Sequence, residues 1–125
     1  MILEYYRHPR NKGRSDVADI HAKVNNPLCG DVCEMFVELG EDGTIEKVLF
    51  DGVGCAISMA SASILTKLVK GRTVEEVREM DKEELLDTLG ITLSPNRLKC
   101  ALLGLETLKA GVRQHKGENV HLHNH

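Results

Sequence analysis

Four cysteines, Cys29, Cys33, Cys55 and Cys100, are the residues of this chain best suited to chemistry. The sequence begins without the charged-then-apolar pattern of a secretion signal. We therefore expect a cytoplasmic protein, in a compartment where thiols seldom pair as disulfides. Metal binding or thiol chemistry is then the better expectation. Asp31, two residues after Cys29, could add one oxygen ligand to several sulfurs.

Three of these cysteines fall at the predicted ends of structural elements, where side chains can converge on a surface. Cys29 lies in a loop before a predicted strand, Cys55 follows the glycines of Gly52–Gly54, and Cys100 lies in the first turns of the last helix. The positive end of a helix favours thiolate over thiol, which applies to Cys55 and Cys100. The neighbouring glycines allow a bulky group to approach closely.

The remaining candidates have simpler explanations. Cys33 alternates with Met35 and Val37, so a buried core thiol is the favoured interpretation. The serines of the following helix (Ser58, Ser61 and Ser63) are expected to cap and pack. Asp31 could be an ordinary turn residue, and Lys99 a solvated charge.

Three thiolates and one harder ligand suit tetrahedral zinc or one iron of a cluster. Permanent zinc sites usually close with paired CxxC or HxxxH spacings, and this sequence has no such pair. Cys29 and Cys33 are spaced as CxxxC, but a strand beginning at Val32 need not turn both to one side. An incomplete, exposed set of ligands favours temporary holding.

The elements that would position these residues are strands first and helices afterwards. Val32–Leu39 alternates between apolar and polar residues as a half-buried strand does, Gly40–Gly43 is a turn, and Thr44–Asp51 is the return strand. An earlier strand within Asp16–Val24 would complete a three-stranded antiparallel meander. Helical periodicity and capping signals predict the helices Ile57–Val69, 73–79, 82–88 and Ser94 to about Val112, after a short one within 1–12 that stops at Pro9.

This order predicts an α+β fold with helices packed on one face of the sheet. We expect a single domain over residues 1–113 and a flexible polar tail over 114–125. The net charge of −3 argues against nucleic-acid binding. The longest apolar stretch, near Ala56–Leu65, is too short to cross a membrane.

Four segments resemble the iron–sulfur cluster assembly scaffolds of the IscU/NifU N-terminal-domain type. They are NPLCGD at Asn26–Asp31, GVGCAISMASAS at Gly52–Ser63, LSPNRLKC at Leu93–Cys100 and YRHPRN at Tyr6–Asn11. The second is the most specific, and the likeness runs from about residue 4 to residue 112.

The resemblance implies an IscU/SufE-like fold and a non-enzymatic scaffold and carrier. Such a protein assembles a labile [2Fe–2S] cluster from iron and from sulfur delivered by a cysteine desulfurase, and passes it to apo iron–sulfur proteins. By resemblance, Cys29, Cys55 and Cys100 bind the cluster, and Cys100 is the persulfide acceptor. Asp31 would be the non-cysteine ligand or the residue that keeps the cluster labile, so Asp31→Ala should prolong cluster lifetime.

The sequence departs from the family pattern at three places. Leu93–Arg97 stands where many members have Leu-Pro-Pro-Val-Lys, and so gives no support for an Hsp70-type chaperone partner. Lys99 replaces a common histidine and should lower the pKa of the Cys100 thiol. Lysine here is similar to the zinc-dependent SufU branch, but 45 positions between Cys55 and Cys100 leave no room for that branch's insertion. Cys33 is the third departure.

Two other functions therefore remain open. One is a zinc-dependent, SufU-like sulfurtransferase with Cys100 as nucleophile, working with a cysteine desulfurase. The other is a small zinc-stabilised interaction domain. In both of these functions zinc would occupy the site in place of the cluster. If the cluster is bound, a symmetric homodimer around it could complete the site.

Overall fold

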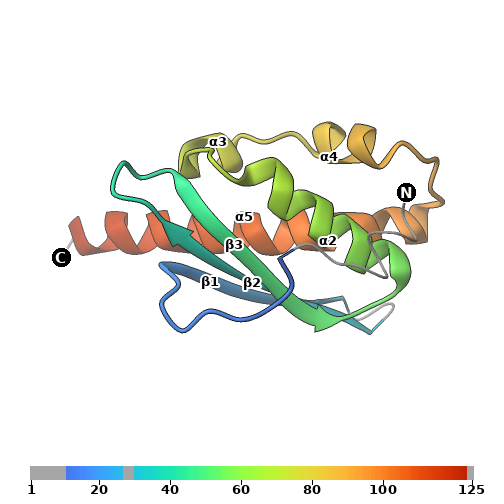
Figure 1. The fold of residues 1–125 in the computed structure, drawn as a ribbon, viewed down its shortest axis with the longest axis horizontal. Coiled ribbons are helices and arrows are strands. Elements are labelled where there is room, and N and C mark those ends of the chain that lie inside the picture. Colours follow the sequence, from blue (N-terminus) through green and yellow to red (C-terminus); the bar gives the residue numbers. More distant parts are fainter. Residues whose placement is uncertain (1–10, 27–29, 124–125) are drawn as a thin grey trace.

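A computed structural model describes residues 11–26 and 30–123 of the chain, with side chains as far as residue 115. Its sheet contains the strands β1 (Ile20–Asn26), β2 (Asp31–Leu39) and β3 (Ile45–Val53). They pair antiparallel in the order β1-β2-β3, which confirms the predicted meander (Figure 1). None of the helices in the described part is long and apolar enough to span a membrane.

Four helices follow the sheet: α2 (Ala56–Val69), α3 (Val74–Arg78), α4 (Lys82–Leu89) and α5 (Pro95–His123). The predicted capping box is present, because Thr73 accepts from the Glu76 backbone and the Glu76 side chain accepts in return. Helix α5 packs along β1 and β2, while α2 packs against β3 and α5. The predicted α+β class, with helices packed on the sheet, is confirmed (Figure 1).

Several element bounds differ from the prediction, and two of the differences matter for the site. Asp31 is the first residue of β2 and does not lie in a turn, and β3 continues past Asp51 to Val53. The pairing of Val32 with Val53 extends the β2–β3 ladder to the end of the sheet at which Asp31 lies. The short helix expected within 1–12 falls almost wholly outside the described residues.

Helix α5 is longer than predicted, because it continues past Val112 to His123. The apolar periodicity fades there, but no proline after Pro95 interrupts the backbone hydrogen bonds. The single domain over 1–113 and the flexibility of 114–125 stay predictions.

Strand β2 is buried on both faces, so its description as half-buried was wrong. Glu34 and Phe36 point away from the helices and are nevertheless only 8% and 4% exposed. Arg14 covers them, with its guanidinium 2.7 Å from a Glu34 carboxylate oxygen and 4.9 Å from the Phe36 ring centre. His21 stacks on Phe36 and also hydrogen-bonds to Glu34. Arg14, and after it His21, hold the pKa of Glu34 below its ordinary value.

Candidate metal centre

Three chemically active side chains converge at one end of the sheet. The ligand atoms of Asp31, Cys55 and Cys100 all lie within 4.8 Å of one another, and no other group of three potential metal ligands forms in the described part of the chain. Asp31 begins β2, Cys55 is the N-cap of α2, and Cys100 lies in the second turn of α5. Asp31 and two of the three cysteines predicted at element ends, Cys55 and Cys100, therefore meet at this end of the sheet.

Two glycines let the chain turn from β3 into α2 directly beside Asp31. Gly52 has a φ of 141°, and a Cβ there would lie 2.0 Å from the carbonyl oxygen of Val32. At Gly54 a Cβ would lie 3.0 Å from Ser58 Cβ and 3.3 Å from Asp31 Cγ. Any side chain at these positions would push the start of α2 away from the start of β2.

The environment of Cys55 favours its thiolate. Burial opposes ionisation, but hydrogen bonds from the side chain and backbone of Ser58, from the Cys100 side chain and from the Ile57 backbone outweigh it. Together they lower the pKa of Cys55 below its ordinary value of 9.0. The Ser58 backbone N–H donates to Cys55 Sγ at 3.5 Å, as expected at a helix N-terminus.

Cys100 and Asp31 are almost completely covered, whereas Cys55 is partly exposed. Asp31 is 5% and Cys100 6% exposed. Sulfur and oxygen ligands of one tetrahedral zinc ion lie roughly 3.5–4 Å apart, which is compatible with the observed grouping within 4.8 Å. Two thiols and one carboxylate are a donor set that suits zinc or iron, with a fourth ligand still to be supplied.

The other predicted site residues are distributed as follows. Cys29 lies outside the described residues, so its role stays a prediction. Lys99 is exposed, next to Cys100 in α5. Cys33 is only 5% exposed in the core, and burial above all raises its pKa to about 11. This confirms the interpretation of Cys33 as a core residue.

Ser58 is the residue whose importance the sequence did not show. We expected only capping and packing from the serines of α2, and Ser61 fits that role by donating to the Ala101 carbonyl at 2.5 Å. Ser58 instead donates to the Asp31 carboxylate at 2.5 Å and lies 3.5 Å from Cys55 Sγ. Its place three residues after an N-cap cysteine, where a helix turns back toward its cap, is the available signal.

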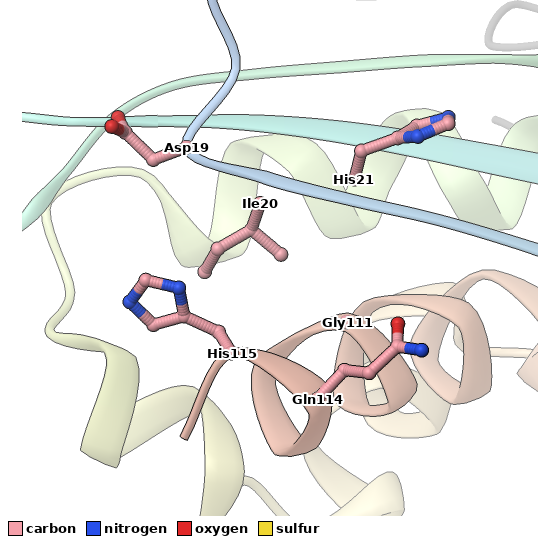
Figure 2. A pocket seen from close by; sticks show the side chains of 6 residues that line it. All are labelled: Asp19, Ile20, His21, Gly111, Gln114 and His115. Atoms are coloured by element: carbon pink, nitrogen blue, oxygen red, sulfur yellow. The ribbon is translucent and has the colours of Figure 1, made fainter. Parts of the chain in front are cut away.

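A hollow elsewhere on the molecule carries no comparable chemistry. It has a volume of about 210 Å³ and lies between β1 and α5, where Asp19, His21 and His115 are among the lining residues (Figure 2). The His21 ring stacks on Phe36, on the outer face of the sheet. The two histidines and the aspartate therefore do not form a group of metal ligands.

A small α+β domain that gathers two thiols and a carboxylate at one end of its sheet defines a class of metal- or sulfur-handling proteins. The chain belongs to the family described as the NifU-like N-terminal domain, whose model matches residues 1–121. This confirms the resemblance noted in the sequence.

Curated relatives cover nearly the whole chain. The zinc-dependent sulfurtransferase SufU of Bacillus subtilis is 35% identical, over 95% of this chain and 91% of the relative. The iron–sulfur cluster assembly scaffold protein IscU of Azotobacter vinelandii is 34% identical, over 92% of this chain and 91% of the relative.

Solved structures share the fold. A protein from Fervidobacterium islandicum, assigned as a cluster assembly scaffold of the SUF system, superposes with a TM-score of 0.73 at 25% identity, covering 89% of this chain and 93% of that chain. A NifU-like N-terminal protein from Brucella abortus has a TM-score of 0.73 at 21% identity, covering 93% and 92%. This second likeness concerns the fold alone.

Proposed function

We propose that this chain is an iron–sulfur cluster assembly scaffold, which builds a labile [2Fe–2S] cluster and transfers it to apo-proteins. The observation that carries the proposal is the convergence of Asp31, Cys55 and Cys100 at the end of the sheet. The family membership and the IscU relatives at about one-third identity support it. The cluster is cargo, so a weak oxygen ligand and partial exposure of Cys55 suit its later release.

The ligand roles follow from the donor atoms and the resemblance. Cys55 and Cys100 supply two thiolates, Cys29 is the proposed third, and Asp31 supplies the single oxygen. Oxygen is a poorer partner than sulfur for a soft metal centre, so Asp31 is the position at which binding is weakest. A symmetric homodimer around the cluster would be an alternative way to complete the coordination.

Sulfur delivery is proposed to take place on Cys100. Its thiolate would attack the terminal sulfur of a persulfide carried by a cysteine desulfurase. One S–S bond forms on Cys100 while the S–S bond of the donor breaks, and the donor cysteine leaves as a thiolate. The step exchanges one thiolate for another and needs no external oxidant or reductant.

A zinc-dependent sulfurtransferase is the second candidate, because the SufU relative is 35% identical. Its alignment spans 136 positions, 11 more than the 125 residues of this chain, so SufU has residues that this chain lacks. The alignment with IscU spans 118 positions, which fit within the length of the chain. This difference in length favours the scaffold.

Anaerobic reconstitution with iron, sulfide and thiol tests the proposal. A scaffold should become red-brown with the absorption of a [2Fe–2S] centre, and Cys33→Ala should do the same as a matched control. A colourless protein that keeps one tight zinc ion, and stimulates a cysteine desulfurase unless Cys100 is changed to serine, would establish the sulfurtransferase instead. We expect the reaction to take place in the cytoplasm, and no feature here supports an Hsp70-type chaperone as partner.

A further inference from the structure

Ser58 stands at the centre of the candidate metal centre without being a metal ligand of the usual kind. Its side chain is buried, with 7% of the residue exposed. The Oγ atom lies 2.5 Å from Asp31 Oδ2, 3.2 Å from the backbone oxygen of Cys100 and 3.5 Å from Cys55 Sγ. One hydroxyl therefore contacts all three residues that form the group.

A serine hydroxyl has one proton, so it can fully satisfy only one acceptor at a time. Asp31 Oδ2 and the Cys100 carbonyl both lie within reach, and the carboxylate is the closer of the two. A charged acceptor also forms the stronger hydrogen bond. Ser58 therefore holds one oxygen of Asp31, and the second oxygen of the carboxylate can still bind a metal.

The structure gives Ser58 a rigid base from which to do this. It lies in the first turn of α2, where its own N–H is bonded to the N-cap Cys55. The absence of a side chain at Gly54 is required, since a Cβ there would lie 3.0 Å from Ser58 Cβ and 3.3 Å from Asp31 Oδ2. The Ser58–Asp31 contact is thus built into the packing between α2 and β2.

We propose that Ser58 is a positioning residue that holds the Asp31 carboxylate in place to bind a borderline or soft divalent metal. This proposal depends on the proposed function in one respect: the metal is the iron of the scaffold, or zinc in its place. Groups that hydrogen-bond to a ligating side chain fix its orientation, and their loss typically weakens metal binding 10- to 100-fold. The effect of Ser58 on metal affinity would come from its hydrogen bond to Asp31, and not from a change in the stability of the fold.

The test is a double-mutant cycle on zinc affinity, measured by competition with a chromophoric chelator under anaerobic, reducing conditions. We expect Ser58→Ala to bind zinc about 10-fold more weakly than the wild type. In an Asp31→Ala background the same change should have no further effect. An unchanged affinity in the single variant, or an equal loss in both backgrounds, would overturn the proposal.

Ser61→Ala is the matched control, because Ser61 is one turn away on α2 and its hydroxyl donates to a backbone oxygen of α5 and not to a residue of the metal centre. We expect it to leave zinc affinity unchanged. Thermal unfolding of the metal-free variants should show a loss of stability for both alanine changes, since each removes one buried hydrogen bond, from Ser58 to the Asp31 carboxylate and from Ser61 to the Ala101 carbonyl. A weakening of zinc binding by Ser61→Ala equal to that by Ser58→Ala would refute a specific role for Ser58.

Two further measurements separate this inference from the proposed function. Cobalt(II) bound to Ser58→Ala should show the altered visible spectrum of Asp31→Ala, whereas Ser58→Thr, which keeps the hydroxyl, should restore most of the wild-type signal. A Thr variant that folds but matches Ala would contradict the proposal. Wild-type protein that binds neither zinc nor a cluster would instead refute the proposed function itself.

Discussion

Cys33 and Cys55 lie close together in the fold and behave as opposite kinds of thiol. Cys33 pairs across the sheet with Gly52, three residues before Cys55. It is 5% exposed and its pKa is raised to about 11, chiefly by burial. Cys55 is partly exposed and its pKa is lowered. The same side chain is thus a core hydrophobe in one place and a ready ligand in the other.

A neighbouring hydroxyl does not explain the difference, because each thiol has one. Cys33 is hydrogen-bonded to Thr107 and Cys55 to Ser58, and both bonds lower the thiol pKa. Burial comes first, because it is the largest cause of the raised pKa of Cys33; Cys55 is less covered and, as the N-cap of a helix, also accepts backbone N–H bonds. Free N–H groups at a helix N-terminus stabilise an anion, and a strand interior offers none.

Replacing the thiols one at a time should produce the largest contrast. Cys55→Ser and Cys100→Ser each remove a sulfur ligand, and we expect zinc affinity to fall by at least about 100-fold. This is more than the usual loss when a residue that hydrogen-bonds to a ligand is changed. Cys33→Ala should leave the affinity unchanged. Chelator competition measures all three variants, and a weakened Cys33→Ala would show that the core thiol reaches the metal after all.

Alkylation rates should separate the same thiols in the metal-free wild-type protein. At pH 8, a pKa near 11 leaves Cys33 at least about 100-fold less ionised than a thiol whose pKa lies below 9. Because only the thiolate reacts, Cys33 should be alkylated more slowly than Cys55 by about the same factor. The rate at Cys55 should level off as the pH passes its lowered pKa, whereas the rate at Cys33 should still rise beyond pH 9. Peptide mass mapping of iodoacetamide adducts measures each site, and comparable rates would refute the contrast.

The part of the site that the sequence could predict is the part set by element ends. Gly52–Gly54 and the Ser94–Pro95 helix start are local signals, and they place Cys55 and Cys100 correctly. Periodicity alone identified Cys33 as core. The meander was predictable for the same reason, since its alternation and turns are local.

What could not be predicted depends on contacts between distant segments. The role of Ser58 requires β2, α2 and α5 to meet, and a buried serine in a small-residue helix gives no sign of its partners. The burial of Phe36 arises because Arg14 folds over the outer face, which no pattern within β2 reveals. Helix α5 was underestimated because apolar periodicity ends before the helical hydrogen bonding does.

Gly54→Ala should perturb the site without removing any ligand. The added methyl would press on Ser58 and Asp31 together. We expect zinc affinity to fall about 10-fold, as for other changes around metal ligands. Gly40→Ala is the matched control, because the two atoms nearest its Cβ would be ends of the exposed Asp42 and Glu46 side chains, at 3.2 Å. Neither Gly40 nor Gly54 has a positive φ. Equal zinc affinity in both variants would show that the contact at Gly54 is not needed.

The smallest expected effect is on stability, at Cys33. Cys33→Ala should lower the free energy of unfolding by about 1 kcal/mol, since it leaves a small cavity and removes a weak hydrogen bond. Thr107 does not lose its partner, because its hydroxyl donates to the Leu103 carbonyl at 2.7 Å. Cys33→Val, which fills the space without a thiol, should therefore be at least as stable as Cys33→Ala in urea unfolding. If valine is the less stable of the two, the space around Cys33 does not admit the extra methyl groups, and the loss in Cys33→Ala does not come from a cavity.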